Sequence, residues 1–224
     1  MMALRGPAKK SRQGGDERLF LVIDFALALV AGAGSWLAVA ALLRHDQPRG
    51  FLPEKERELS GYTLTDETGR TVTRKELAGK MLVVSFLLTS CSLTCPEVTK
   101  RMVEIQALTA TSADVRLVSL TVDPRTDTPS VLAKWGIRFG ANTNRWHFLT
   151  GAKPMLYGLI GTSFLAQDSS DPFNSMPGNF TGTERIAVVD QHGRIRRYFG
   201  GLRNDTPTAV MTEIARLHRE PCIL

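Results

Sequence analysis

Two cysteines separated by three residues form the part of this sequence best suited to chemistry. Cys91 and Cys95 enclose Ser92-Leu93-Thr94, follow the apolar run 81–88 and directly precede Pro96. Proline is favoured in the first turn of a helix, so the pattern predicts a strand, a cysteine loop and then a helix. Backbone N–H groups at a helix N-terminus favour the thiolate over the thiol. A thiolate attacks disulfides and also binds soft metals, so both chemistries are open.

The order of these residues indicates different positions for the two sulfur atoms. Because a residue directly before proline avoids helical geometry, we expect Cys95 to be the N-cap of the helix and Cys91 to lie in the loop ahead. Three uses of the pair follow from the residues alone. The thiols could bind a soft metal, cycle between dithiol and disulfide, or form a structural disulfide, which is the default in an exported protein.

The N-terminal part of the chain predicts export and a membrane anchor. Residues 19–43 are apolar except for Asp24, and five Lys or Arg residues precede them. A stretch of this length can cross a bilayer as a helix, and the basic residues place its N-terminal side in the cytoplasm. The alternative is a cleaved signal peptide, because Ala38-Val39-Ala40 has the small residues of a cleavage site.

Length and composition place one folded domain after this anchor. The chain has 224 residues, of which 43% are hydrophobic, enough for one core and an appendage. We expect a cytoplasmic segment 1–18, a transmembrane helix 19–43, a linker 44–59 and a folded domain 60–224, which would lie outside the cytoplasm.

Several functional classes are disfavoured by the composition. The net charge of +6 comes from basic residues spread along the chain, without the aromatic interleaving of a nucleic-acid surface, so we expect no nucleic-acid partner. The sequence contains no phosphate-binding glycine loop, and four histidines are few for a zinc hydrolase.

The folded part alternates between strand and helix patterns. Helical spacing predicts a turn at 75–79, about four helical turns from 96, and helices 128–139, 154–160 and 207–219. Alternating or continuously apolar runs predict strands 61–65, 70–73, 81–88, 115–122, 146–149, 185–189 and 194–199. Residues 168–183 show no periodicity and are expected to form a loop. This order indicates an α/β fold, a thioredoxin-like mixed sheet flanked by helices.

Four sequence blocks together resemble the Sco/SenC family. They are Cys91–Pro96, Ser119–Pro129 with its Asp-Pro-x-x-Asp-Thr-Pro segment, Phe148–Gly151 and Val189–Gly193, and they follow the family's order. The resemblance implies a membrane-anchored, thioredoxin-like protein that binds copper through two cysteines and one distant histidine. Such proteins help to mature the Cu-A centre of cytochrome c oxidase, and some act in thiol-disulfide or redox signalling instead.

The cysteines of the family correspond to Cys91 and Cys95, but the histidine has no counterpart. Counting back from Val189, the corresponding residue is Gly182, which has no donor atom. Met176, in the same predicted loop, is a candidate third ligand because a thioether is soft. We therefore expect Cu(I), which accepts two sulfur ligands, rather than Cu(II). The expected partner is a cytochrome c oxidase subunit or another copper or thiol protein.

The cysteine pair and segment 123–129 each have a second interpretation. Without copper, the Cys91–Cys95 pair would serve a thiol-disulfide oxidoreductase or a redox sensor. Segment 123–129 lies beside the cysteine loop in the family, whereas from the residues alone Asp123-Pro124 forms a turn and Asp127 or Thr128 caps a helix.

Overall fold

The computed structural model describes residues 57–164 and 184–220. All of them belong to one unit, Pro48–Leu224. The predicted segments 1–18 and 19–43, most of the linker 44–59 and nearly all of the predicted loop 168–183 lie outside the described residues. Within the described ranges no helix is both long and apolar enough to span a bilayer.

A six-stranded mixed sheet forms the centre of this unit, in the order β1-β8-β7-β4-β5-β6. Strands β4 (Met81–Leu87), β5 (Val115–Thr121) and β6 (Trp146–Leu149) are parallel. On the other side of β4, β7 (Arg185–Val189) and β8 (Arg194–Gly200) form an antiparallel hairpin. The short β1 (Arg57–Glu58) pairs with β8; the sequence did not predict it.

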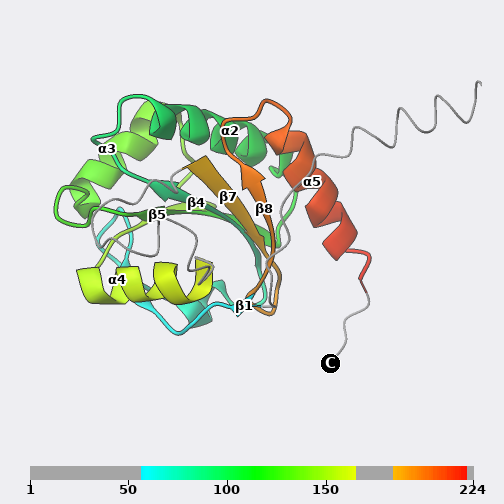
Figure 1. Cartoon of the computed structure of the whole chain (residues 1–224), viewed down its shortest axis with the longest axis horizontal. Coiled ribbons are helices and arrows are strands. Elements are labelled where there is room, and N and C mark those ends of the chain that lie inside the picture. Colours follow the sequence, from blue (N-terminus) through cyan, green and yellow to red (C-terminus); the bar gives the residue numbers. More distant parts are fainter. Residues whose placement is uncertain (1–56, 165–183, 221–224) are drawn as a thin grey trace, which may run out of the picture. The chain divides into compact units, whose positions relative to one another are not determined.

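Helices cover both faces of the sheet (Figure 1). Helices α2 (Thr94–Leu108), α3 (Pro129–Phe139) and α5 (Thr206–Leu217) bury their apolar side chains against one face. Helix α4 (Lys153–Leu159), which continues as the π-helix η2 (Ile160–Phe164), covers the other face. The expected α/β class, a mixed sheet flanked by helices, is confirmed.

Strand β4 connects the two halves of the core. All seven of its residues are buried, and they alternate between the two faces: Leu82, Val84 and Phe86 pack with α4, and Met81, Val83 and Leu87 pack with the other helices. A strand buried on both faces shows a continuous hydrophobic run instead of alternation. This explains why residues 81–88 are so apolar and why the cysteine loop begins from the centre of the sheet.

A second, two-stranded hairpin lies at the open edge of β6. Strands β2 (Thr63–Thr65) and β3 (Thr71–Thr73) confirm the predicted hairpin, and the 3-10 turn η1 (Arg74–Leu77) follows it. Backbone bonds of 2.7 and 2.8 Å between Thr65 and Thr150 attach it to the end of β6. The Asp66 carboxylate accepts the N–H groups of Thr68 and Arg70, both at 2.9 Å, which closes the turn.

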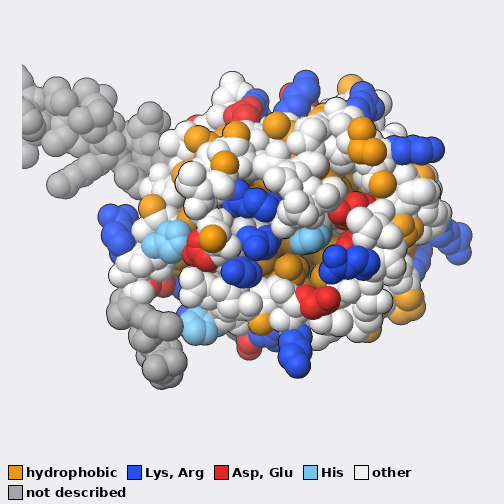
Figure 2. All heavy atoms as spheres, turned by 180° about the vertical axis from the view of Figure 1, so that it is seen from behind, with side chains coloured by type: hydrophobic (Ala, Val, Ile, Leu, Met, Phe, Trp, Pro, Cys, Tyr) orange, Lys and Arg blue, Asp and Glu red, His pale blue; other side chains and the backbone are white. Residues whose placement is uncertain are grey.

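Basic side chains are spread over the surface among acidic and neutral ones, as Figure 2 shows for one face. Several are neutralised locally. Arg194 and Arg196 both pair with Asp190, at 2.9 and 3.0 Å, and Arg216 pairs with Glu213 at 2.6 Å. These ion pairs neutralise part of the positive charge in this part of the chain.

Polar groups inside the sheet form a closed hydrogen-bond network. Ser85 on β4 and Ser119 on β5 share a 2.8 Å hydrogen bond, and Ser119 Oγ accepts the indole N–H of Trp146 at 3.0 Å. All three side chains are buried. Because an unpaired buried polar group costs free energy, this network fixes the register of three neighbouring strands.

Replacing the central hydroxyl should destabilise the domain. In Ser119→Ala the indole N–H of Trp146 loses its acceptor, so we expect the free energy of unfolding to fall by about 1–3 kcal/mol, measured by urea denaturation. The matched change at an exposed serine, Ser130→Ala, should alter it by less than about 0.5 kcal/mol. Equal effects at the two positions would contradict the role of the network.

Candidate thiol site

The cysteine loop joins the end of β4 to the start of α2, as the sequence predicts. Cys91 is partly exposed, whereas Cys95 is buried at 1% exposure. The prediction that Cys95 is the N-cap is wrong: α2 begins at Thr94, its N-cap is Leu93, and Cys95 is the second helical residue. Pro96 is then third in the helix, where the N–H that proline lacks has no intrahelical partner anyway.

The sulfur of Cys91 occupies the place of a capping side chain. Leu93 has no polar group, and no side chain of the N-cap residue bonds to the helix. Instead Cys91 Sγ accepts the backbone N–H of Cys95 at 3.5 Å and lies 3.3 Å from the hydroxyl oxygen of Thr94. The first N–H groups of a helix have no intrahelical partner, so a negatively charged sulfur is stabilised there.

These contacts determine the ionisation of Cys91. Burial alone raises the pKa of its thiol. The hydroxyl of Thr94 and N–H groups of the first turn outweigh burial and lower the pKa from 9.0 to about 6. At neutral pH Cys91 is therefore largely a thiolate, the form that attacks disulfides and binds metals.

Cys95 is held by contacts to the helices around it. Its side chain belongs to the core beneath α2 and α3. Its carbonyl accepts the hydroxyl of Thr99 at 2.7 Å, and Thr99 Oγ1 in turn accepts the indole N–H of Trp135 at 3.2 Å. The site thus has an outer, reactive sulfur on Cys91 and an inner sulfur on Cys95 whose position the fold determines.

A buried carboxylate supports the loop from the other side. Asp127 is fully buried and accepts the hydroxyl groups of Thr121 on β5 and Thr89 in the loop. The N–H of Thr89 also points to this carboxylate, at 3.3 Å. Segment 123–129 therefore lies against the start of the cysteine loop. The N-cap of α3 is Thr128 and not Asp127.

The other candidate ligands lie either outside the described residues or on other elements of the fold. Gly182 and Met176 lie outside the described residues. His147 lies on β6, His192 in the turn between β7 and β8, and His218 after α5. Among the described side chains no His, Asp or Glu forms a three-membered metal-ligand cluster with the two cysteines. The described part of the site therefore offers two sulfur ligands.

Sequence reasoning missed the two threonines that support the site. Thr94 directly precedes Cys95, and its hydroxyl on the first helical residue was a recognisable signal, because threonine is common at helix N-termini. Thr89 gave no such signal, since its partner Asp127 is 38 residues away. The loop also presents Leu93, which is 79% exposed, so an apolar side chain stands between the two cysteines.

The ionisation of Cys91 can be measured by its alkylation rate. A lowered pKa keeps the thiolate at neutral pH and loses it as the pH falls below the pKa. In Cys222→Ser protein, the iodoacetamide reaction of Cys91, followed by mass spectrometry, should therefore reach a plateau above pH 7 with a midpoint near 6.

The same alkylation experiment tests whether the hydroxyl of Thr94 lowers the pKa of Cys91. Thr94→Val should raise the midpoint by about one pH unit, the equivalent of one hydrogen bond to a charged group. Thr208→Val, at an exposed threonine of α5, should leave it unchanged. A midpoint near 9 in the unmodified site would show that the sulfur is not stabilised by the helix.

The buried carboxylate of Asp127 should stabilise the folded domain. Asp127→Ala leaves the hydroxyls of Thr89 and Thr121 without their charged acceptor, so we expect a loss of about 2–3 kcal/mol in unfolding free energy. Asp123→Ala, in the same segment but partly exposed, should cost less than about 1 kcal/mol. Urea denaturation measures both, and equal losses would argue against the buried contact.

Proteins of one known family are similar in sequence to this chain. A sequence model of the SCO1/SenC family matches residues 52–219. The SCO1 protein homolog of Bacillus subtilis is 34% identical over 164 residues, which cover 70% of this chain and 81% of the relative. A SCO2-like protein of Rickettsia felis is 29% identical over 187 residues, covering 79% and 88% respectively.

Solved structures show the same fold. A SCO1/SenC family lipoprotein from Bacillus anthracis superposes with a TM-score of 0.62 at 24% identity, covering 74% of this chain and 99% of the other. Yeast Sco1 with copper bound gives 0.60 at 18% identity, covering 75% and 97%. At such identities the likeness concerns the fold. The family match and the Bacillus subtilis relative carry the assignment: this chain belongs to the SCO1/SenC family.

Proposed function

We propose that this protein binds Cu(I) through Cys91 and Cys95 and delivers it to a copper-requiring protein during assembly of the Cu-A centre of cytochrome c oxidase. The observation that carries the proposal is the pair of sulfur atoms at the start of α2, one of them held as a thiolate. On this proposal the protein is a metallochaperone and not an enzyme.

The donor set favours the reduced ion. Cu(I) is soft and accepts two sulfur ligands, whereas Cu(II) is stabilised by nitrogen ligands and a larger coordination set. The described part of the site offers two cysteines and no imidazole beside them. Glycine at position 182, where the family resemblance places histidine, agrees with the same preference. Met176 remains the candidate third ligand.

The relatives support both copper binding and a role in cytochrome c oxidase assembly. Yeast Sco1 and Bradyrhizobium japonicum ScoI have solved structures with copper bound. BsSco is described as a member of the Sco family of cytochrome c oxidase assembly proteins. Membership of the same family extends both properties to this chain as a proposal.

The N-terminal sequence supplies the location. We place residues 19–43 in the cytoplasmic or inner membrane as a single span, with segment 1–18 in the cytoplasm. Linker 44–59 would then carry the domain 60–224 in the periplasm, or in the mitochondrial intermembrane space of a eukaryote. The basic residues before the span support this orientation.

The asymmetry of the two sulfurs suggests how copper leaves. A thiolate of the client can reach Cys91, which is partly exposed, and replace it as a ligand, while Cys95 is buried and releases the ion last. The exposed Leu93 offers an apolar contact for the client beside the sulfur that it attacks. Such ligand exchange moves the ion without leaving it free in solution.

Dithiol exchange is the second candidate, and the lowered pKa of Cys91 favours it. The Cys91 thiolate would attack a client disulfide, form a mixed disulfide and release one client thiolate. Cys95 would then displace the second client sulfur. The client gains two electrons as a dithiol, and this protein becomes the disulfide. A disulfide switch has been identified in BsSco.

Anaerobic titration of the reduced full-length protein in detergent, against a competing Cu(I) chelator, tests the copper proposal. We expect one Cu(I) per chain. Cys91→Ser and Cys95→Ser should each weaken binding at least about tenfold, because each removes one of two ligands. Cys222→Ser is the matched control and should bind as the unchanged protein does.

A parallel titration with Cu(II) tests the ligand set. The unchanged protein should bind Cu(II) weakly, and Gly182→His should gain a Cu(II) complex with a visible sulfur-to-copper band. A strong band without the substitution would contradict the preference for Cu(I). Absence of Cu(I) binding, together with a disulfide potential in the range of exchange catalysts, would favour the second candidate.

A further inference from the structure

Two acidic side chains and one histidine meet at the open edge of β6, outside the thiol site. Asp66 and Glu67 belong to the turn between β2 and β3, and His147 lies on β6. Each of the three offers one ligand atom, and these atoms all lie within 4.8 Å of one another. They come from segments about 80 residues apart in the chain, so the tertiary fold assembles the group.

The two carboxylates are buried without a paired cation. Asp66 is 3% exposed and Glu67 is 6% exposed. In the described part of the chain no Lys or Arg forms an ion pair with either, and Arg70 acts on Asp66 only at longer range. Adjacent buried carboxylates repel each other when both are ionised, and a metal ion bound between them would remove that repulsion.

Hydrogen bonds satisfy only some of the polar atoms of these three side chains. Asp66 accepts the turn N–H groups through Oδ1, and Glu67 accepts the N–H of Phe148 at 2.8 Å through Oε2. Within the described residues, the second oxygen of each carboxylate has no hydrogen-bond partner. Nδ1 of His147 is shielded from solvent and likewise unpaired. The imidazole of His147 therefore keeps one buried nitrogen without a hydrogen-bond partner, and one of its ring nitrogens lies within 4.8 Å of the two carboxylates.

The chemistry of the three groups selects the ligand. Imidazole nitrogen with two carboxylate oxygens suits a divalent transition-metal ion of intermediate hardness, such as Zn²⁺, and not Cu(I), which prefers sulfur. Zinc ligands stand about 2.0–2.2 Å from the ion, hence about 3.4 Å from one another. The three ligand atoms lie within 4.8 Å of one another, so they must approach by up to about 1.4 Å to hold the ion.

We propose that Asp66, Glu67 and His147 form a second metal site, selective for a divalent ion such as Zn²⁺. An ion there would neutralise the two buried carboxylates and attach the β2–β3 hairpin to the edge of the main sheet. The hairpin is otherwise attached to β6 by the backbone pairing of Thr65 with Thr150 and by the hydrogen bond of Glu67. The site therefore serves stability and not copper transfer.

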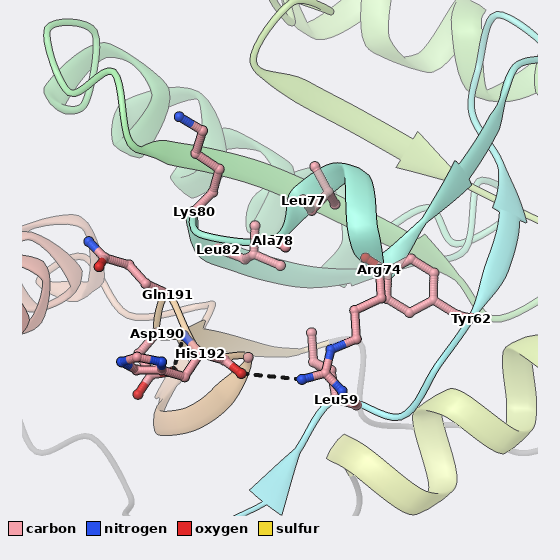
Figure 3. A pocket seen from close by; sticks show the side chains of 11 residues that line it. Leu59, Tyr62, Arg74, Leu77, Ala78, Lys80, Leu82, Asp190, Gln191 and His192 are labelled. Carbon is pink, nitrogen blue, oxygen red and sulfur yellow. Dashed lines mark hydrogen bonds between the residues drawn. The ribbon is translucent and has the colours of Figure 1, made fainter. Parts of the chain in front are cut away.

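This site is separate from the thiols and from a cavity at the other end of β4. Strand β6 lies two strands away from β4 in the sheet. The cavity, about 60 Å³, is lined by Arg74, Lys80 and His192 among others (Figure 3). There Arg74 donates to the carbonyls of Leu59 and His192.

Zinc binding to the full-length protein in detergent tests the proposal. All three cysteines are first replaced by serine, so that no thiol competes for the ion. We expect one Zn²⁺ per chain by isothermal titration, with a higher unfolding temperature in Zn²⁺ than in EDTA. Glu67→Gln and His147→Gln should each weaken binding at least about tenfold. Glutamine at position 67 keeps an acceptor for the N–H of Phe148, which preserves the fold.

Matched controls separate this site from adventitious binding. Glu104→Gln on α2 and His192→Gln in the β7–β8 turn change exposed residues of the same types and should leave the zinc affinity unchanged. Imidazole NMR signals provide a readout without substitution at the site: of the four histidines, His147 should shift on zinc addition. No bound zinc, or equal binding in the site and control variants, would overturn the proposal.

Discussion

The contact between the Cys91 sulfur and the first turn of α2 connects the fold of this protein to its chemistry. A helix that starts at Thr94 leaves N–H groups without intrahelical partners, and Leu93 at the N-cap cannot satisfy them. The sulfur of Cys91 accepts one of them instead. The helix is capped and the thiol becomes a thiolate through the same contact. The rest of the structure, from the buried strand β4 to the core beneath α2, keeps this junction in place.

Most of the fold could be predicted from the sequence because its elements carry local signals. Strand β6 was predicted to the residue, and β4, β5, α3 and the β7–β8 hairpin to within one or two residues at their ends. Strands β4 and β5 are apolar along most of their length, α3 begins with Pro129, and β7 and β8 flank the turn Asp190–Gly193. The two-residue strand β1 has no such signal. It exists because β8 offers an unpaired edge, and an edge contact depends on tertiary structure.

The site could be predicted less completely, for a related reason. The cysteines were identified from their spacing. The predicted position of Cys95 was wrong because a residue before proline avoids helical geometry only as a tendency, and Cys95 is helical here. The buried contact of Asp127 with Thr89 and the meeting of Asp66 and Glu67 with His147 both join residues far apart in the chain. Local patterns carry no information about such pairs, so they became visible only in the folded structure.

The carboxylate of Asp127 links the cysteine loop to two neighbouring elements. It belongs to the segment that leads into α3, yet it accepts hydrogen bonds from the loop that carries Cys91 and from β5. One buried anion is thus shared by three elements that meet beside the sulfur atoms. If the binding of a partner to segment 123–129 changes the affinity of the thiols for a ligand, then the binding of that ligand changes the affinity for the partner by the same factor, because thermodynamic linkage is reciprocal.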